Sequence, residues 1–195
     1  MVLSSAKDYS KVPTNFGNST PERLKESNIK AIRQNGQIQI YQSAYRGSFS
    51  NIIRDSLRNA ALGRKVLLIQ IMKGGVKQGI NNPVSLCGNL VWIRPSNSYD
   101  HYEKDEIENN EIISRSIKDS VAEIWAFCKK QLLSGLQDQI ILDEIFRAVE
   151  LGIIEKNDLI STLENRFISG DVILTGTNIP KEFLLMADQV TELRS

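Results

Sequence analysis

One segment of the chain combines residues that could bind a phosphate group, and its composition raises a question. It reads YQSAYRGSFSN, residues 41–51, and it lies between a strand-like run and a helix-like run, as the phosphate loop of a nucleotide-binding protein does. Its candidate phosphate-binding residues are Ser43, Arg46, Gly47, Ser48 and Ser50. The guanidinium of Arg46 suits a phosphate oxygen, and the first N–H groups of the following helix suit an anion. A phosphate loop is rich in glycine and carries a lysine, whereas this segment has one glycine and no lysine.

Strand and helix patterns alternate from residue 37 to the end of the chain. We expect strands at residues 37–41, 65–72, 89–94, 139–144, 171–176 and 189–193. We expect helices at residues 50–61, 113–132 and 180–187, and two short helices before the fifth strand, the second with Asn157 as its N-cap. This alternation predicts an α/β domain whose sheet has about six strands, is mostly parallel and is covered by helices on both faces.

Four loops are expected to meet, because ligands of parallel α/β sheets bind at the carboxyl ends of the strands. The loops follow Tyr41, Met72, Leu142 and Leu174, and they read QSAYRGS, KGGVKQG, DEIFR and TGTN. Beyond the first loop, they supply Lys73, Gly74, Asp143, Glu144, Thr175 and Gly176. Together these loops form the candidate site.

The ends of the chain and its composition limit the classes of function. Residues 1–19 predict a disordered tail, residues 20–36 an N-terminal helix, and residues 37–195 a single domain. The formal net charge of +1 argues against a nucleic-acid-binding protein. The longest apolar run is too short to cross a bilayer and the N-terminus has no signal-peptide pattern, so we expect a cytoplasmic protein without membrane insertion.

Cysteine, histidine and tryptophan are sparse, and their positions favour structural roles. Cys87 and Cys128 lack the C-x-x-C spacing of a metal or redox motif, so reduced thiols are expected. His101 is the only histidine and lies in a polar loop, which argues against a histidine-rich zinc site. Trp92 and Trp125 fall within apolar patterns and are expected in the core.

Three segments of the chain resemble the P-loop type of corrinoid adenosyltransferase. They read KVLLIQIMKGG, IILDEIFRAVELGIIEKNDLISTLENR and DVILTGTNIPKEFLLMADQVTELR, and their order and spacing match that family from about Gln37 to Arg194. The resemblance implies a RecA-like, three-layer P-loop NTPase domain that forms a homodimer. It also implies transfer of the 5′-deoxyadenosyl group of ATP to the reduced cobalt(I) of a corrinoid, with Mg²⁺ and release of triphosphate, in cobalamin biosynthesis.

The resemblance places the family's phosphate loop on residues 42–50 without a gap. The family motif, Thr-Gly-Asn/Asp-Gly-Lys-Gly-Lys-Thr-Thr, then keeps only Gly47, with Arg46 in place of a lysine. Ser48 stands where the loop lysine belongs, and Phe49 stands where the hydroxyl that binds Mg²⁺ belongs. Tyr45 replaces a glycine at which the backbone turns toward the phosphates. Together these changes predict a loss in ATP affinity of about 100-fold or more.

Two other loops keep the family's charged residues. Asp143 and Glu144 match the acidic pair that holds Mg²⁺ through water, and Lys73 and Gly74 match a lysine–glycine pair after the second strand. An ordinary acidic turn at the end of a strand is the alternative interpretation of the acidic pair. A solvated lysine is the alternative interpretation of Lys73.

The remaining loops depart further from the family. The TGTN loop keeps the first two residues of the family's TGRG, while Thr177 and Asn178 replace its arginine and its second glycine. The family's aromatic loop on the corrinoid side falls on Asn97 and Tyr99. One cation and the expected aromatic pair are therefore missing from the corresponding positions.

The sequence favours a diverged member of this family whose transferase activity is weak or lost, and which acts as a nucleotide- or partner-binding module. One alternative is an active ATP:corrinoid adenosyltransferase in which Arg46 and Lys73 bind the phosphates. A second alternative is a protein-interaction scaffold without a small ligand, whose protein partner the sequence does not name.

Overall fold

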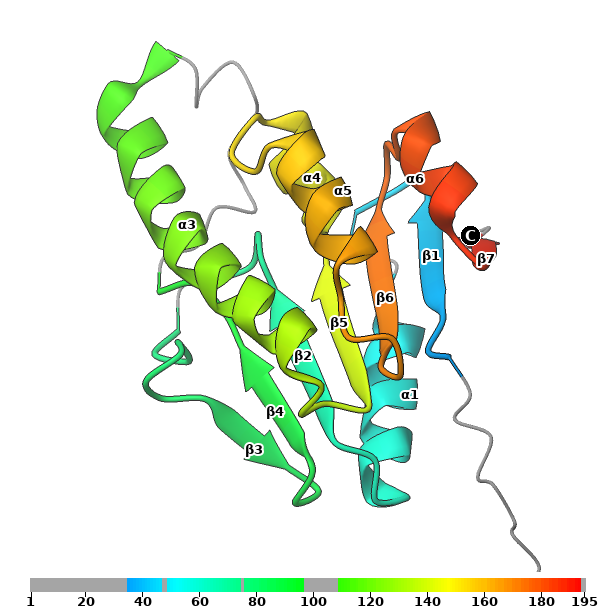
Figure 1. Cartoon of the computed structure of the whole chain (residues 1–195). Helices are drawn as coiled ribbons and strands as arrows, with labels where there is room; N and C mark the ends of the chain where they lie inside the picture. The colour runs from blue at the N-terminus through cyan, green and yellow to red at the C-terminus, as the bar shows by residue number, and fades with distance from the viewer. Residues whose placement is uncertain (1–34, 47–48, 75, 97–108, 194–195) are drawn as a thin grey trace, which may run out of the picture. The chain divides into compact units, whose positions relative to one another are not determined.

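A computed structural model of the chain describes residues 35–46, 49–74, 76–96 and 109–193. These residues fall within the unit Arg33–Ser195, and they form one sheet with helices on both faces (Figure 1). The tail predicted for residues 1–19, most of the helix predicted for residues 20–36, and His101 lie outside the described residues. The division into a tail, a helix and a domain therefore stays a prediction.

Seven strands form the sheet, in the order β3-β4-β2-β5-β6-β1-β7. In chain order they are β1 (Ile38–Ser43), β2 (Val66–Gln70), β3 (Val84–Leu86), β4 (Leu90–Ile93), β5 (Gln139–Asp143), β6 (Asp171–Gly176) and β7 (Gln189–Leu193). Every neighbouring pair is parallel except β3 and β4, which are antiparallel. The predicted α/β sheet is confirmed, with seven strands in place of about six.

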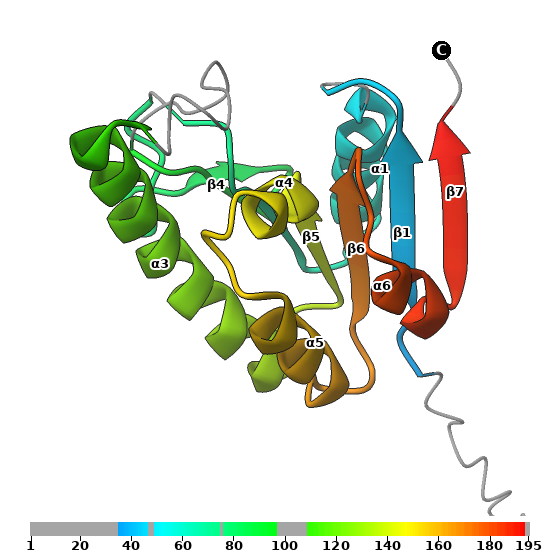
Figure 2. The ribbon, with the colours of Figure 1, turned by 90° about the horizontal axis from the view of Figure 1, so that it is seen from above.

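The helices lie in two layers, one on each face of the sheet. They are α1 (Ser50–Ala61), α3 (Glu111–Ser134), α4 (Ile145–Glu150), α5 (Lys156–Glu164) and α6 (Lys181–Met186). Seen from above, α1 lies on one face and the other four helices lie on the opposite face (Figure 2). This is the three-layer arrangement that the resemblance implied.

Apolar side chains fill both interfaces between the sheet and the helices. Every residue of β2 and β5 is buried, as expected of strands that are covered on both faces. Helix α3 buries the stripe that its sequence predicts, namely Ile117, Val121, Ile124, Trp125, Cys128 and Leu132. On the opposite face, the second core comprises Phe49, Ile52, Ala60, Val66, Leu68, Leu90, Ile141 and Ile173. These cores fix the strands whose ends carry the candidate site.

Two local features differ from the sequence-based expectation. The sequence pattern misses β3, because its three residues are exposed or half-buried and show no apolar alternation. The prediction of Asn157 as an N-cap is wrong, since α5 starts at Lys156 and Glu155 is the N-cap residue, with no hydrogen bond from its side chain. The chain thus enters α5 two residues earlier than the prediction of Asn157 as the N-cap.

The cysteines and Trp125 have the structural positions expected of them. Cys87 is exposed, Cys128 is buried and both are free. Burial raises the pKa of the Cys128 thiol far above its ordinary value, so this thiol stays protonated. Trp125 lies in the core beneath α3, as predicted. Within the described ranges, no helix is both long and apolar enough to cross a membrane.

Candidate functional site

The four predicted loops meet at one edge of the sheet. Strands β2, β5, β6 and β1 are consecutive, parallel neighbours, so their carboxyl ends lie side by side (Figure 1). In strand order this edge carries Lys73 and Gly74, Asp143 and Glu144, Thr175 and Gly176, and then Ser43 and Arg46. We call it the carboxyl edge.

The acidic pair at the end of β5 is buried and tied to both neighbouring strands. Asp143 and Glu144 are each only 2% exposed. The hydroxyl of Thr175 donates to Asp143 Oδ1 at 2.8 Å and accepts the N–H of Glu144 at 2.8 Å. The amide of Gln70 donates to Asp143 Oδ2 at 2.7 Å. The carboxylate of Asp143 is therefore held by β2 on one side and by β6 on the other.

Two cations from neighbouring loops pair with these carboxylates. Arg46 Nη2 lies 2.9 Å from Glu144 Oε2. Lys73 Nζ lies 3.4 Å from Asp143 Oδ2 and 3.7 Å from Glu144 Oε1. Buried carboxylates are costly without counter-charges, so these two cations stabilise the acidic pair. The structure thus brings together Arg46, Lys73, Asp143 and Glu144, which the sequence singled out separately.

The backbone of Glu144 is in an unusual conformation. Its φ of 58° is in the left-handed region, which residues other than glycine seldom adopt. Its Oε1 is buried and has no hydrogen-bond partner among the described residues. Backbone strain and an unsatisfied buried acceptor commonly mark functional sites, and here both fall on one residue.

The described side chains of the first loop lie in different environments. Ser43 is buried, and its hydroxyl accepts the N–H of Tyr45 at 3.3 Å. The ring of Tyr45 is 65% exposed, while Phe49 is 1% exposed and packs in the core beneath α1. Ser50 is exposed at the first position of α1, and residues 47–48, which hold the predicted Gly47 and Ser48, lie outside the described part of the chain.

Comparisons with known proteins show which family the chain belongs to. The family model described as ATP:corrinoid adenosyltransferase BtuR/CobO/CobP matches residues 34–195. The chain belongs to this family. It is 23% identical over 174 residues to the corrinoid adenosyltransferase of Escherichia coli (strain K12), an alignment that covers 89% of this chain and 84% of that protein.

Two further relatives show how diverged this member is. Corrinoid adenosyltransferase CobA of Salmonella typhimurium is 22% identical over 173 residues, which cover 89% of this chain and 84% of that protein. The uncharacterized protein all2391 of Nostoc sp. is 22% identical over 184 residues, which cover 88% of this chain but 47% of the relative. The chain thus spans about half the length of the Nostoc protein.

The described residues do not fit the Mg²⁺ site that the family implies. Both oxygens of Asp143 already accept hydrogen bonds, and Lys73 occupies the space between the two carboxylates. Phe49, which the resemblance places at the family's metal-binding hydroxyl, has no side-chain oxygen and is buried. Within the described ranges, no group of three or more His, Cys, Asp or Glu residues could hold a metal ion. Glu144 Oε1 is the one carboxylate oxygen of the pair without a hydrogen bond from a described residue.

Sequence reasoning missed the role of Gln70 and assigned Trp92 to the core alone. The indole N–H of Trp92 donates to Gln70 Oε1 at 3.2 Å, and the Gln70 amide in turn holds Asp143. Trp92 is half-buried, and the guanidinium of Arg94 lies 4.5 Å from its ring centroid. A glutamine inside the apolar run KVLLIQIM was the available signal, because a buried amide needs polar partners.

The described contacts of the loop after β6 mainly hold neighbouring elements of the fold together. A Cβ on Gly176 would lie 2.6 Å from the Cβ of Phe146, so the glycine allows α4 to pack closely against β6. The carbonyl of Thr177 accepts from Gln42, and the amide of Asn178 donates to Glu150. The two residues that replace the family's arginine and glycine are therefore engaged with neighbouring elements.

The corrinoid side of the site is only partly described. Asn97 and Tyr99 lie outside the described residues. A hollow of about 200 Å³ lies beside the end of β4, lined by Lys77, Gly79, Ile80, Asn81, Asn82, Arg94, Pro95, Ser96, Ser120, Glu123 and Ile124. This volume is below the range of about 300–1,000 Å³ that is typical of small-molecule pockets.

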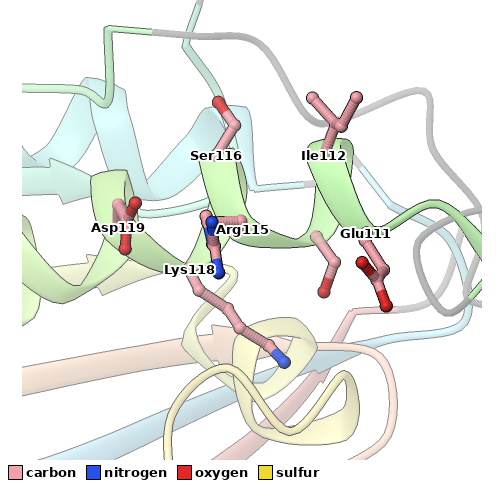
Figure 3. Close-up of a pocket in the computed structure, with 7 residues that line it drawn as sticks. Glu111, Ile112, Arg115, Ser116, Lys118 and Asp119 are labelled. Atoms are coloured by element: carbon pink, nitrogen blue, oxygen red, sulfur yellow. The ribbon is translucent and has the colours of Figure 1, made fainter.

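A larger hollow, about 900 Å³, lies elsewhere, along the first turns of α3. The lining residues that the structure describes come from that helix (Figure 3). Ile112 and Ser116 point to one side of the helix, whereas Glu111 and Lys118 point to the other. These side chains do not converge on one point, so the carboxyl edge remains the better candidate for ligand binding.

Proposed function

We propose that this member of the corrinoid adenosyltransferase family has weak or no transferase activity and acts as a binding module for the phosphate chain of a nucleotide. The position of Phe49 is the observation that carries the proposal. Its ring fills the core at the point where the family's phosphate loop presents a hydroxyl to Mg²⁺. Restoring a hydroxyl there would require removing an aromatic side chain from the packed interior.

The charges at the carboxyl edge also support weak nucleotide binding. Arg46 and Lys73 are the cations that face the end of β5, and both are paired with carboxylates. A phosphate chain must compete with these ion pairs. The family's loop lysine, which would add a further charge-assisted contact, is Ser48 in this sequence.

The direct test is an adenosylation assay with ATP, Mg²⁺ and chemically reduced cob(I)alamin, followed by the absorbance change of the cobalt centre. We expect a rate close to that of the reaction without protein. A rate that scales with protein concentration and saturates with ATP would contradict the proposal and establish the active transferase. Failure of ATP to bind under any condition would instead favour the interaction scaffold.

The homodimer and the cytoplasmic location remain predictions. Light scattering coupled to size-exclusion chromatography measures the mass of the particle in solution and so tests the first. Neither property is needed for the binding proposal, since all four charged residues of the carboxyl edge come from one chain.

A further inference from the structure

Four charged side chains at the carboxyl edge neutralise one another. Arg46 pairs with Glu144, and Lys73 lies between Glu144 and Asp143. The two carboxylate side chains are 3% and 2% exposed, whereas the side chains of Arg46 and Lys73 are 31% and 26% exposed. A ligand arriving from solvent therefore meets the cations before it meets the carboxylates.

We propose that Glu144 is a counter-ion that competes with a polyphosphate ligand for Arg46 and Lys73, and that this edge takes the ligand without a divalent metal. This inference rests on the proposed function, because it assigns the two cations to the same phosphate chain. It goes further because it names Glu144 as the residue that limits the affinity for the polyphosphate, and because it assigns no metal ion to the site.

The two carboxylates are held differently. Asp143 is fixed by hydrogen bonds from Gln70 and Thr175, which belong to the neighbouring strands. Glu144 receives one short contact, from Arg46, and its second oxygen is buried without a hydrogen bond from a described residue. Glu144 is therefore the carboxylate whose charge acts chiefly on the cations, while Asp143 is also part of the framework of the sheet.

We assign no role to a metal ion, because Lys73 lies where such an ion would bind the two carboxylates. Its ammonium group lies within 4 Å of both carboxylates, at 3.4 Å and 3.7 Å, which is the place a bridging cation would take. The unsatisfied oxygen of Glu144 faces this ammonium. A divalent ion would have to displace Lys73 and would find no hydroxyl at Phe49 to complete its ligands.

The two possible roles of Glu144 predict opposite effects of one substitution. If Glu144 were a metal ligand, Glu144→Gln would weaken binding of a polyphosphate in the presence of Mg²⁺. If Glu144 is a competing counter-ion, the same change removes a negative charge that competes for Arg46 and Lys73, so binding becomes tighter. Gln keeps the size of the side chain, so the comparison isolates its charge.

The experiment is a calorimetric titration of the full chain with inorganic triphosphate, in Mg²⁺ and in EDTA. We expect Glu144→Gln to tighten binding by about three- to tenfold in both buffers, the range that one competing ion pair near a surface gives. Unchanged or weaker binding by the variant would overturn the proposal. Glu182→Gln is the matched control, because Glu182 on α6 forms an exposed ion pair with Lys156 on α5. Its substitution removes an equal charge and should leave the affinity as in the wild type.

A second arm tests the metal directly, with Mn²⁺ alone as the probe and electron paramagnetic resonance as the readout. We expect the signal of free Mn²⁺ to be the same with wild type, with Glu144→Gln and without protein. Stoichiometric Mn²⁺ binding by wild type that Glu144→Gln abolishes would overturn the proposal. The two proposals can fail independently. The proposed function requires the wild type to bind triphosphate, whereas the counter-ion role requires only that Glu144→Gln binds triphosphate more tightly than the wild type.

Discussion

Phe49 and Thr175 show how single residues decide what the carboxyl edge can do. The resemblance places Phe49 at the family's metal-binding hydroxyl, and in the structure its ring is part of the core. Thr175 is fully buried and joins Asp143 to the backbone of Glu144. In our proposal Phe49 supplies no ligand for a metal ion, whereas Thr175 holds the two acidic residues together.

Phe49→Ala should lower the free energy of unfolding by about 3–5 kcal/mol, the usual cost of removing a buried aromatic ring. Chemical denaturation followed by circular dichroism measures this difference. Tyr45→Ala is the control, because the Tyr45 ring is 65% exposed and its loss should change the stability by less than about 0.5 kcal/mol. Equal effects of the two substitutions would mean that Phe49 does not pack in the core.

Thr175→Val should destabilise the fold by about 1–3 kcal/mol, because it leaves the N–H of Glu144 and one oxygen of Asp143 without their shared partner. Thr175→Ser keeps the hydroxyl and should retain most of the stability. Thermal or chemical unfolding of the two variants gives the comparison. If Val were tolerated as well as Ser, the hydroxyl bridge would have no energetic importance.

At the scale of elements, a polar contact joins helices α3 and α5. The indole N–H of Trp125 on α3 donates to Asp158 on α5 at 2.7 Å, and Lys129 pairs with the same carboxylate at 2.9 Å. These contacts hold the pKa of Asp158 below its ordinary value, with the hydrogen bond from Trp125 as the largest cause. The carboxylate form of Asp158 is therefore stabilised by folding.

Trp125→Phe should lower the free energy of unfolding at neutral pH by about 1 kcal/mol, since the ring still packs but the hydrogen bond to a partly exposed carboxylate is lost. Because the folded pKa of Asp158 is depressed, this stabilisation is present above the unfolded pKa of about 3.9 and is lost as the pH falls through the folded pKa. Urea titrations of both proteins at pH 7 and near pH 3 measure the difference. A difference that stays constant between the two pH values would contradict this account of Asp158.

The elements were predictable from the sequence where burial gives a regular pattern, and unpredictable where it does not. The continuous apolar runs of β2 and β5 and the stripe on α3 predict those elements correctly. The edge strand β3 gives no such pattern because its side chains are mostly exposed. In the same way, strand order predicts that the loops converge, but no spacing rule predicts that Arg46 reaches Glu144 across 98 residues of sequence.

For the molecule as a whole, the family and the α/β fold are shown, whereas weak ATP binding is our proposal. The family match covers residues 34–195, and the described residues keep a parallel sheet with helices on both faces. A fold supports function only through the site built on it, so family membership does not by itself establish transferase activity. At the carboxyl edge, the acidic pair and the cations Arg46 and Lys73 pair with one another.

Calorimetric titration of the full chain with ATP, in Mg²⁺ and again in EDTA, tests the central claim most directly. Because the cations of the carboxyl edge are paired with carboxylates and Phe49 is buried, we expect a dissociation constant for ATP of order 10⁻⁴ M or weaker. Removal of Mg²⁺ should not raise this constant. A dissociation constant of order 1 μM or below in Mg²⁺, lost in EDTA, would contradict the account. Such a result would mean that the altered loop and the acidic pair assemble a working metal–nucleotide site after all.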